Sequence, residues 1–135
     1  MTRAVRPLEG IKVVEFSHMV LGPSCGLILA DLGADVVKVE PAPEGDKTRL
    51  LPGSGSGFFG AFNRNKRSVT VNLKSPEGRK FAINLIRQSD VLIENFGKGV
   101  MDRLNLGYKS TQEINSKLIY CSLKGFLSGP YENRA

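Results

Sequence analysis

Residues 11–40, IKVVEFSHMVLGPSCGLILADLGADVVKVE, decide the fold of this chain. The run Ile11–Phe16 is short and rich in β-branched residues, which is typical of a buried strand. Pro23 can begin a helix whose body, residues 25–32, is apolar on most sides, as in a helix packed on a sheet. Residues 35–40 form the next strand. The stretch therefore predicts one βαβ unit with a right-handed crossover.

The rest of the chain continues this alternation of strands and helices. Three more strands are predicted, at residues 68–73, 90–94 and 118–123. An amphipathic helix begins at Ser75 and Pro76, and a short helical segment lies around residues 111–115. This order predicts an α/β fold, a Rossmann-like open parallel sheet with helices on both faces. Residues 128–135 complete no strand or helix, so we expect the sheet to be incomplete at its C-terminal side.

Composition predicts one globular domain in the cytoplasm. The chain has 135 residues, 41% of them hydrophobic, and no apolar run approaches the roughly 18 residues of a membrane span. Residues 1–7 lack the apolar core of a signal peptide. Cys25 and Cys121 stand far apart without a ligand cluster, so neither a disulfide framework nor a metal site is predicted. Cys25 is expected to be a small core residue.

The charge of the chain predicts an anionic ligand. The formal net charge is +6, with six Lys and Arg against seven Asp and Glu in residues 1–60 and thirteen against six in residues 61–135. These basic residues are scattered, and no known nucleic-acid-binding module is present. A small polyphosphate is therefore a better partner for this surface than a nucleic acid.

In an open parallel sheet, ligands bind outside the carboxyl ends of the strands. Lys74 precedes a helix start, where the ammonium and the helix amides could hold one anion. Asn95-Phe96-Gly97 could approach an adenine or a pantetheine arm closely, although it could also be a plain turn. The segments expected at this edge are Ser17–Gly22, Pro41–Gly60, Lys74, Asn95–Lys98 and Lys124–Phe126.

A dinucleotide-binding enzyme is the obvious alternative. Glu40 ends its strand about where such folds place the acid that binds ribose. However, the first strand-to-helix turn, residues 17–22, lacks the glycines that admit a pyrophosphate. Residues 55–60 match G-x-G-x-x-G but begin fifteen residues after Glu40, in a loop with no predicted helix behind it. We interpret this match as coincidental.

Two further features have more than one interpretation. His18 is the single histidine and could be a general base, but no nucleophile with an orienting acid can be assigned, so a binding or structural role is favoured. The basic cluster Asn63–Arg67 could be either a solvated turn or a phosphate or partner contact.

Several ordered motifs resemble the N-terminus of the class III (CaiB/BaiF-type) CoA-transferases, and the resemblance covers nearly the whole chain. These motifs are residues 7–16, Gly22-Pro23, residues 29–40, Gly45-Asp46 with Arg49, residues 63–68, residues 90–96 and residues 129–131. The resemblance implies transfer of CoA from an acyl-CoA to a small carboxylic acid, through a mixed anhydride and an aspartyl-CoA thioester. It also implies a homodimer of interlinked chains.

The resemblance further implies where coenzyme A would bind. The implied contacts fall on His18, Val20, Leu21, Asn72, Leu73, Lys74, Asn95, Phe96, Gly97 and Arg103. Some formyl-type members have Gln where this chain has Val20, which counts against a formyl or oxalyl substrate.

The family's nucleophilic Asp would lie beyond Ala135, so no catalytic residue is assigned. We expect residues 1–135 to be the N-terminal, CoA-binding part of a large domain, inactive alone, without the second domain and the C-terminal segment. Two alternatives stay open. The chain could come from a relative of the α-methylacyl-CoA racemases, or it could be a truncated, non-catalytic interaction module.

Overall fold

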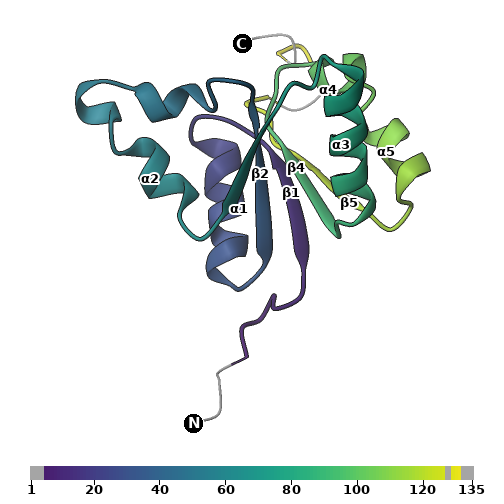
Figure 1. The fold of residues 1–135 in the computed structure, drawn as a ribbon, viewed down its shortest axis with the longest axis horizontal. Coiled ribbons are helices and arrows are strands. Elements are labelled where there is room, and N and C mark those ends of the chain that lie inside the picture. Colours follow the sequence, from purple (N-terminus) through teal and green to yellow (C-terminus); the bar gives the residue numbers. More distant parts are fainter. Residues whose placement is uncertain (1–4, 127–128, 132–135) are drawn as a thin grey trace.

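The sheet is the centre of the molecule. The computed structural model describes residues 5–126 and 129–131 (Figure 1). Five strands pair in parallel in the order β3-β2-β1-β4-β5. They are β1 Lys12–Phe16, β2 Asp35–Pro41, β3 Arg67–Val71, β4 Val91–Glu94 and β5 Ile119–Ser122. The predicted α/β fold with an open parallel sheet is confirmed.

Helices cover both faces of this sheet, as predicted. Figure 1 shows α1 and α2 on one face, with α3 and α5 on the other. The helices are α1 Leu21–Asp31, α2 Phe58–Asn63, α3 Pro76–Arg87, α4 Val100–Arg103 and α5 Tyr108–Ile114. Each face therefore has its own apolar core.

The alternation of side chains along the strands divides the core in two. Val14, Phe16 and Leu92 point toward α3, where they pack with Ala82 and Ile86. The neighbouring positions, among them Val13, Val36 and Ile93, point toward α1 and pack with Ala30 and Ala34. Burying each of the larger side chains contributes about 1.5–3 kcal/mol. The strands therefore bury their residues on both sides, which explains their continuous apolar sequences.

The start of α3 follows the prediction closely. Ser75 caps the helix, since its hydroxyl accepts a hydrogen bond from Gly78 N at 3.0 Å, and Pro76 is the first helical residue. The helix buries Ala82 and Ile86, whereas Phe81 is 43% exposed and lies outside the buried face.

The first helix and the first cysteine differ slightly from expectation. The helix α1 begins at Leu21, two residues before Pro23. A proline is tolerated in the first turn, because the N–H groups there have no partner inside the helix. Cys25 lies on this helix, half-buried against the cluster that contains Val13 and Ile93.

The segment predicted as a long loop contains regular structure. Two 3₁₀ turns, Lys47–Leu50 and Gly53–Gly55, precede α2. Asp46 begins the first turn by accepting hydrogen bonds from the amide and hydroxyl of Thr48, at 2.9 and 2.8 Å. The helix α4 was not predicted either, and α5 begins three residues earlier than expected. Of the predicted C-terminal end, residues 128–135, residues 128 and 132–135 lie outside the described residues.

Candidate functional site

Strand order makes the ends of β1 and β4 the natural ligand site. The chain runs outward from β1 through β2 to β3, then returns to place β4 on the other side of β1. The crevice at such a reversal is where open α/β sheets bind ligands. Phe16, which ends β1, pairs in register with Glu94, which ends β4. The two loops that follow these residues are therefore neighbours.

The side chain of Asn95 joins these two loops. Its Oδ1 accepts a hydrogen bond from His18 N at 3.0 Å, and its Nδ2 donates to His18 O at 2.9 Å. The His18 ring stacks on Phe96, with ring centroids 5.9 Å apart and planes 18° from parallel. The structure thus brings together three of the predicted site residues, His18, Asn95 and Phe96.

An open groove begins at this junction and follows the ends of β4 and β5. It has a volume of about 830 Å³. Of the predicted residues, Leu21, Asn95, Phe96 and Gly97 line it. Its remaining wall combines apolar and aromatic side chains with charged ones: Met101, Tyr108, Tyr120, Leu123 and Phe126, and Glu94, Lys98, Asp102 and Lys124. Flat apolar walls with a few polar groups suit a planar ring or a thin, mostly apolar arm.

A buried carboxylate supports the turn at Phe96. Glu94 is 2% exposed and accepts hydrogen bonds from Lys124 Nζ on both oxygens, at 2.8 and 2.9 Å, and from the hydroxyl of Ser122. Phe96 N donates to Glu94 at 2.9 Å, and Lys124 Nζ donates to Phe96 O at 2.5 Å. The ammonium of Lys124, expected to face an anion, is therefore engaged within the protein.

Tyr120 lies beside this carboxylate. Burial raises the pKa of its phenol, and the carboxylates of Glu94 and Asp102 raise it further. A phenol is protonated at neutral pH at its ordinary pKa, and the upward shift keeps it so. Tyr120 also lines the groove.

The remaining predicted residues lie around the groove or further along the same edge. Arg103 is exposed at the end of α4, whose residues Met101 and Asp102 line the groove. Val20 is the N-terminal cap residue of α1, and its carbonyl accepts hydrogen bonds from the amide and hydroxyl of Ser24.

Three more predicted residues follow β3: Asn72, Leu73 and Lys74. In the sheet, β2 and β1 lie between β3 and β4. Asn72 accepts hydrogen bonds from Lys74 N at 3.0 Å and from Ser75, which shapes the start of α3. Leu73 packs against the core, and Lys74 is exposed. Lys74 thus lies at the predicted helix start, on the edge strand of the sheet.

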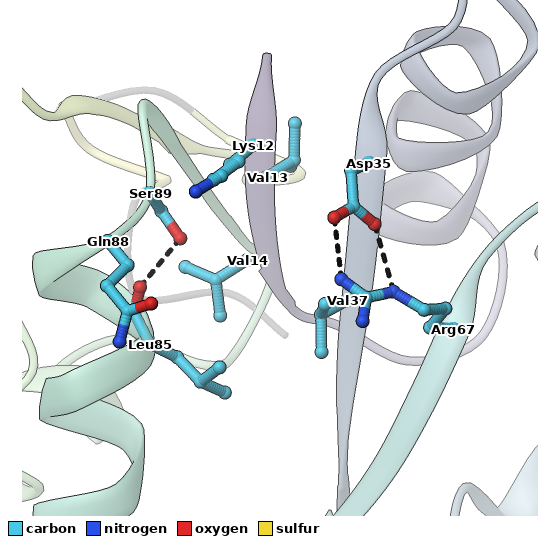
Figure 2. A pocket seen from close by; sticks show the side chains of 9 residues that line it. All are labelled: Lys12, Val13, Val14, Asp35, Val37, Arg67, Leu85, Gln88 and Ser89. Atoms are coloured by element: carbon cyan, nitrogen blue, oxygen red, sulfur yellow. Dashed lines mark hydrogen bonds and ion pairs between the residues drawn. The ribbon is translucent and has the colours of Figure 1, made fainter. Parts of the chain in front are cut away.

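A second, smaller depression lies at the opposite end of the strands (Figure 2). It has a volume of about 170 Å³ and lies between the starts of β1 and β2 and the end of α3. Arg67 donates two hydrogen bonds to Asp35 there, at 3.0 and 2.6 Å. Since the amino ends of parallel strands are seldom ligand sites, we assign no function to it.

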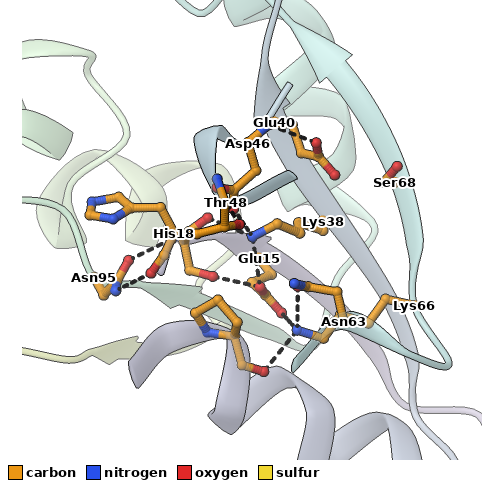
Figure 3. A network of polar contacts seen from close by, with 12 residues as sticks. Glu15, His18, Lys38, Glu40, Asp46, Thr48, Asn63, Lys66, Ser68 and Asn95 are labelled. Atoms are coloured by element: carbon orange, nitrogen blue, oxygen red, sulfur yellow. Dashed lines mark hydrogen bonds and ion pairs between the residues drawn. The ribbon is translucent and has the colours of Figure 1, made fainter. Parts of the chain in front are cut away.

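A network of buried charges lies beneath the loop after β1 (Figure 3). Glu15 and Lys38 are opposite each other on β1 and β2, both 0% exposed, with Lys38 Nζ 3.4 Å from Glu15 Oε1. Lys66 Nζ lies 2.8 Å from Glu15 Oε2, and Lys38 Nζ lies 3.0 Å from Asp46 Oδ2. Burial lowers the pKa of the Lys66 ammonium, while Glu15 acts in the opposite direction.

The sequence analysis missed this network. The available signal was an acid and a lysine placed inside β-branched runs that were predicted to be buried, because isolated charges are almost never buried in such strands.

Glu40 is also fully engaged. Arg49 donates to both of its oxygens at 2.8 Å, and Asp46 N donates at 2.9 Å. Burial opposes ionisation of Glu40, but these hydrogen bonds outweigh it, so the pKa of the carboxyl lies below its ordinary value. The guanidinium also covers the ring of Phe59, 3.6 Å from its centroid. Glu40 has no free oxygen for a ribose hydroxyl, which argues against a dinucleotide site.

The G-x-G-x-x-G match needs a correction. A helix, α2, does begin at Phe58 within it, contrary to the prediction that none follows. This helix has only six residues and follows two 3₁₀ turns, not the strand β2 directly. The segment therefore still lacks the strand-turn-helix context of a dinucleotide fingerprint.

The basic cluster Asn63–Arg67 serves the fold. Arg64 and Asn65 bind the carboxylate of Asp31 at 2.6 and 2.7 Å, and Arg67 binds Asp35. Lys66 is buried against Glu15. The cluster therefore makes contacts within the chain and does not form a free phosphate-binding surface.

Within residues 5–126 and 129–131, no group of three or more His, Cys, Asp or Glu side chains could hold a metal ion. Over the same residues, every helix is too short or too polar to cross a membrane.

Comparisons with known proteins agree on one family. The family described as CoA-transferase family III matches residues 8–135. A formyl-CoA:oxalate CoA-transferase of Bradyrhizobium sp. (strain ORS 278) is 45% identical over 98% of this chain and 32% of its own length. The protein of the same name from Streptomyces coelicolor is 48% identical over 93% of this chain, again 32% of its length. This chain thus spans about a third of these relatives.

Solved structures give the same result. A CAIB/BAIF family protein from Brucella suis superimposes with a TM-score of 0.90 at 45% identity, covering 98% of this chain and 37% of that one. A short chain dehydrogenase/reductase family protein reaches a TM-score of 0.50 at 15% identity and shares the fold alone.

Proposed function

Because this chain belongs to CoA-transferase family III, we propose that it forms the N-terminal, coenzyme-A-binding part of an enzyme that moves CoA from an acyl-CoA to a carboxylic acid. The family match over residues 8–135 carries the proposal. In this proposal, the nucleophilic carboxylate of the complete enzyme lies outside residues 1–135. These residues bind the carrier and perform no transfer alone.

The groove at the ends of β4 and β5 supports a carrier of this shape. Coenzyme A has a planar adenine, charged phosphates and a thin pantetheine arm. Phe96 and Tyr120 offer flat surfaces for the ring or the arm, and Asn95 and Gly97 offer close main-chain approach. Arg103 and Lys74 are exposed cations near or along the same edge, and cations of this kind bind phosphate.

The evidence for a particular acyl group and acceptor acid is less direct. The relatives named as formyl-CoA:oxalate CoA-transferases favour a small dicarboxylate acceptor. Val20, which caps α1 beside the groove residue Leu21, offers no side-chain hydrogen bond to such a substrate. We therefore propose an acyl-CoA and a small carboxylic acid as the substrate class, without a specific acid.

The test is a calorimetric titration of the chain with CoA at low salt. The variants Lys74→Ala and Arg103→Ala each remove one proposed phosphate contact, and a hydrogen bond to a charged group contributes about 1.5–3 kcal/mol, so each should weaken binding about tenfold or more. The control is Arg87→Ala, an equal charge change at the opposite end of α3. Unchanged affinity in both variants would place the phosphates elsewhere, and no binding by the unmodified chain would refute the proposal.

A further inference from the structure

Two buried ammonium groups lie under the turn that connects β1 to α1 (Figure 3). Lys38 Nζ donates a hydrogen bond to Ser17 O at 2.7 Å, and Lys66 Nζ donates to Pro23 O at 2.8 Å. Both side chains are 1% exposed. Ser17 precedes the segment His18–Leu21, and Pro23 lies two residues after it, in the first turn of α1. A different lysine therefore bonds the main chain on each side of this segment.

One of the two carboxylates that neutralise these lysines also binds the same turn. Glu15 lies between the two ammonium groups and accepts a hydrogen bond from the Ser17 hydroxyl at 2.5 Å. Asp46 contacts Lys38 from the segment after β2. Burying such groups is costly, and apolar side chains of similar size often fill the same space with no loss of stability. What apolar side chains cannot do is bond the main-chain oxygens of Ser17 and Pro23.

Helix α1 lies directly against this network because of two glycines. A Cβ at Gly26 would lie 1.8 Å from Glu15 Oε2, and a Cβ at Gly22 would lie 2.4 Å from Ser17 Cβ. These glycines are four residues apart and share one face of the helix. The start of α1 therefore has no space in which to shift relative to the charges.

The segment held in this way has an unusual conformation. Met19 has a positive φ of 61°, which non-glycine residues adopt only when their surroundings enforce it. From the side, Asn95 bonds both main-chain groups of His18. The conformation is thus fixed by Asn95 on one side and by the lysines beneath.

We infer that Lys38 and Lys66 are positioning residues for coenzyme A: they hold the main chain of His18–Leu21 in its binding conformation before the ligand arrives. This inference rests on the proposed function, because it assigns the segment to the CoA site. Neither lysine touches the carrier. Their effect on affinity comes from the fraction of molecules in which the turn is already formed.

The experiment separates positioning from stability by using charge-neutral pairs of substitutions. The first is Lys38→Met with Asp46→Asn, and the second is Lys66→Met with Glu15→Gln. Each pair removes one positive and one negative charge, so no lone buried charge is left to unfold the chain. The matched control is Arg64→Met with Asp31→Asn, which removes an exposed ion pair from a neighbouring part of the same face.

Two measurements are made on each variant of the full chain. Backbone amide NMR without ligand should show altered shifts and faster exchange at residues 17–22 in addition to the changes at the substituted positions, while the signals of Leu92 and Ile86 in the other core stay unchanged. A CoA titration should show affinity about tenfold weaker, as expected if the turn is formed about one tenth of the time. The control should match the unmodified chain in both.

The outcomes decide whether the two lysines position the turn for CoA or only stabilise the fold. Unchanged amide signals at residues 17–22 in folded variants would overturn the inference, and so would altered signals with unchanged CoA affinity. If the unmodified chain does not bind CoA, the proposed function fails and the inference about CoA fails with it. The amide signals would then still report whether the lysines hold the turn.

Discussion

The side chain of Asn95 forms hydrogen bonds with both main-chain groups of His18, although the two residues are 77 positions apart in the sequence. One amide side chain satisfies both the N–H and the carbonyl of a residue in a neighbouring loop. The arrangement links the ends of β1 and β4, the point where the strand order reverses. A change at Asn95 should therefore affect the whole strand-end edge, not only one loop.

We predict that Asn95→Asp will destabilise the chain more than Asn84→Ala. A carboxylate can accept from His18 N, but it cannot donate to His18 O and would face that carbonyl with its own negative charge. An unsatisfied polar group costs about 1–3 kcal/mol, and the free energy of unfolding in urea should fall by that amount. Asn84 is an exposed residue of α3 whose side chain accepts a hydrogen bond from Arg87 one turn along the same helix, so it serves as control. Equal effects of the two changes would contradict the special role of Asn95.

The second prediction concerns Lys124 and Glu94. Lys124→Met removes the ammonium from a buried carboxylate, which among residues 5–126 and 129–131 then keeps the Ser122 hydroxyl and the Phe96 amide as hydrogen-bond partners. Because the lysine side chain is 33% exposed, we expect a loss of about 1–3 kcal/mol, below the range of fully buried pairs. Adding Glu94→Gln should recover part of the loss, since the lone buried charge disappears.

Urea unfolding of the single and double variants measures this coupling. If the losses are simply additive, Glu94 and Lys124 do not act as a pair in solution.

Acid should unfold the chain partly through Glu40 and Asp46. Burial raises the pKa of the Asp46 carboxyl, but hydrogen bonds from Thr48 and Lys38 outweigh it, so that pKa, like that of Glu40, lies below its ordinary value. The unfolded chain therefore binds more protons, and the stabilisation is complete above about pH 5. It is lost as the pH falls below about 4 and through the folded-state pKa values.

Urea midpoints between about pH 6 and about pH 3 test this expectation. Glu40→Gln should lower stability at pH 6 and flatten its acid dependence, whereas Glu44→Gln, in the same segment but exposed, is the matched control. A variant curve parallel to that of the unmodified chain would show that Glu40 does not contribute.

The sequence predicted the sheet well because strand formation depends on local residue type. All five strands lie within two residues of their predicted bounds, since each is a β-branched run flanked by polar or turn-forming residues. The helix α2 was missed because Gly57 and Gly60 weaken its local signal. It is held instead by long-range contacts, such as the bond from its C-terminal cap residue Arg64 to Asp31 of α1.

The site was predicted only in part, because its contacts join residues that are far apart in the sequence. Residue types indicated that Asn95 and Phe96 follow a strand, but not that Asn95 would bond His18. Lys38 lies on β2 and Lys66 in the turn before β3, and only the folded chain brings both to Glu15. A pattern can show that a charge is buried, whereas its partner is a property of the tertiary structure.

The last prediction compares two glycines, both in helices. Gly60→Ala in α2 should stabilise the chain by about 0.5–1 kcal/mol, because nothing lies within 4 Å of the added Cβ and alanine favours a helix. Gly26→Ala in α1 should destabilise it by about 1–3 kcal/mol despite the same helical preference. Its Cβ would displace the Glu15 carboxylate, which is ion-paired with Lys66 and cannot move without leaving that lysine unneutralised.

Thermal and urea unfolding of both variants give the comparison, and opposite signs are the expected result. If Gly26→Ala stabilised the chain as Gly60→Ala should, then Glu15 would be free to move, and α1 would not rest on a fixed network of charges. The close contact between this helix and Glu15 is thus tested by one methyl group, independently of any ligand.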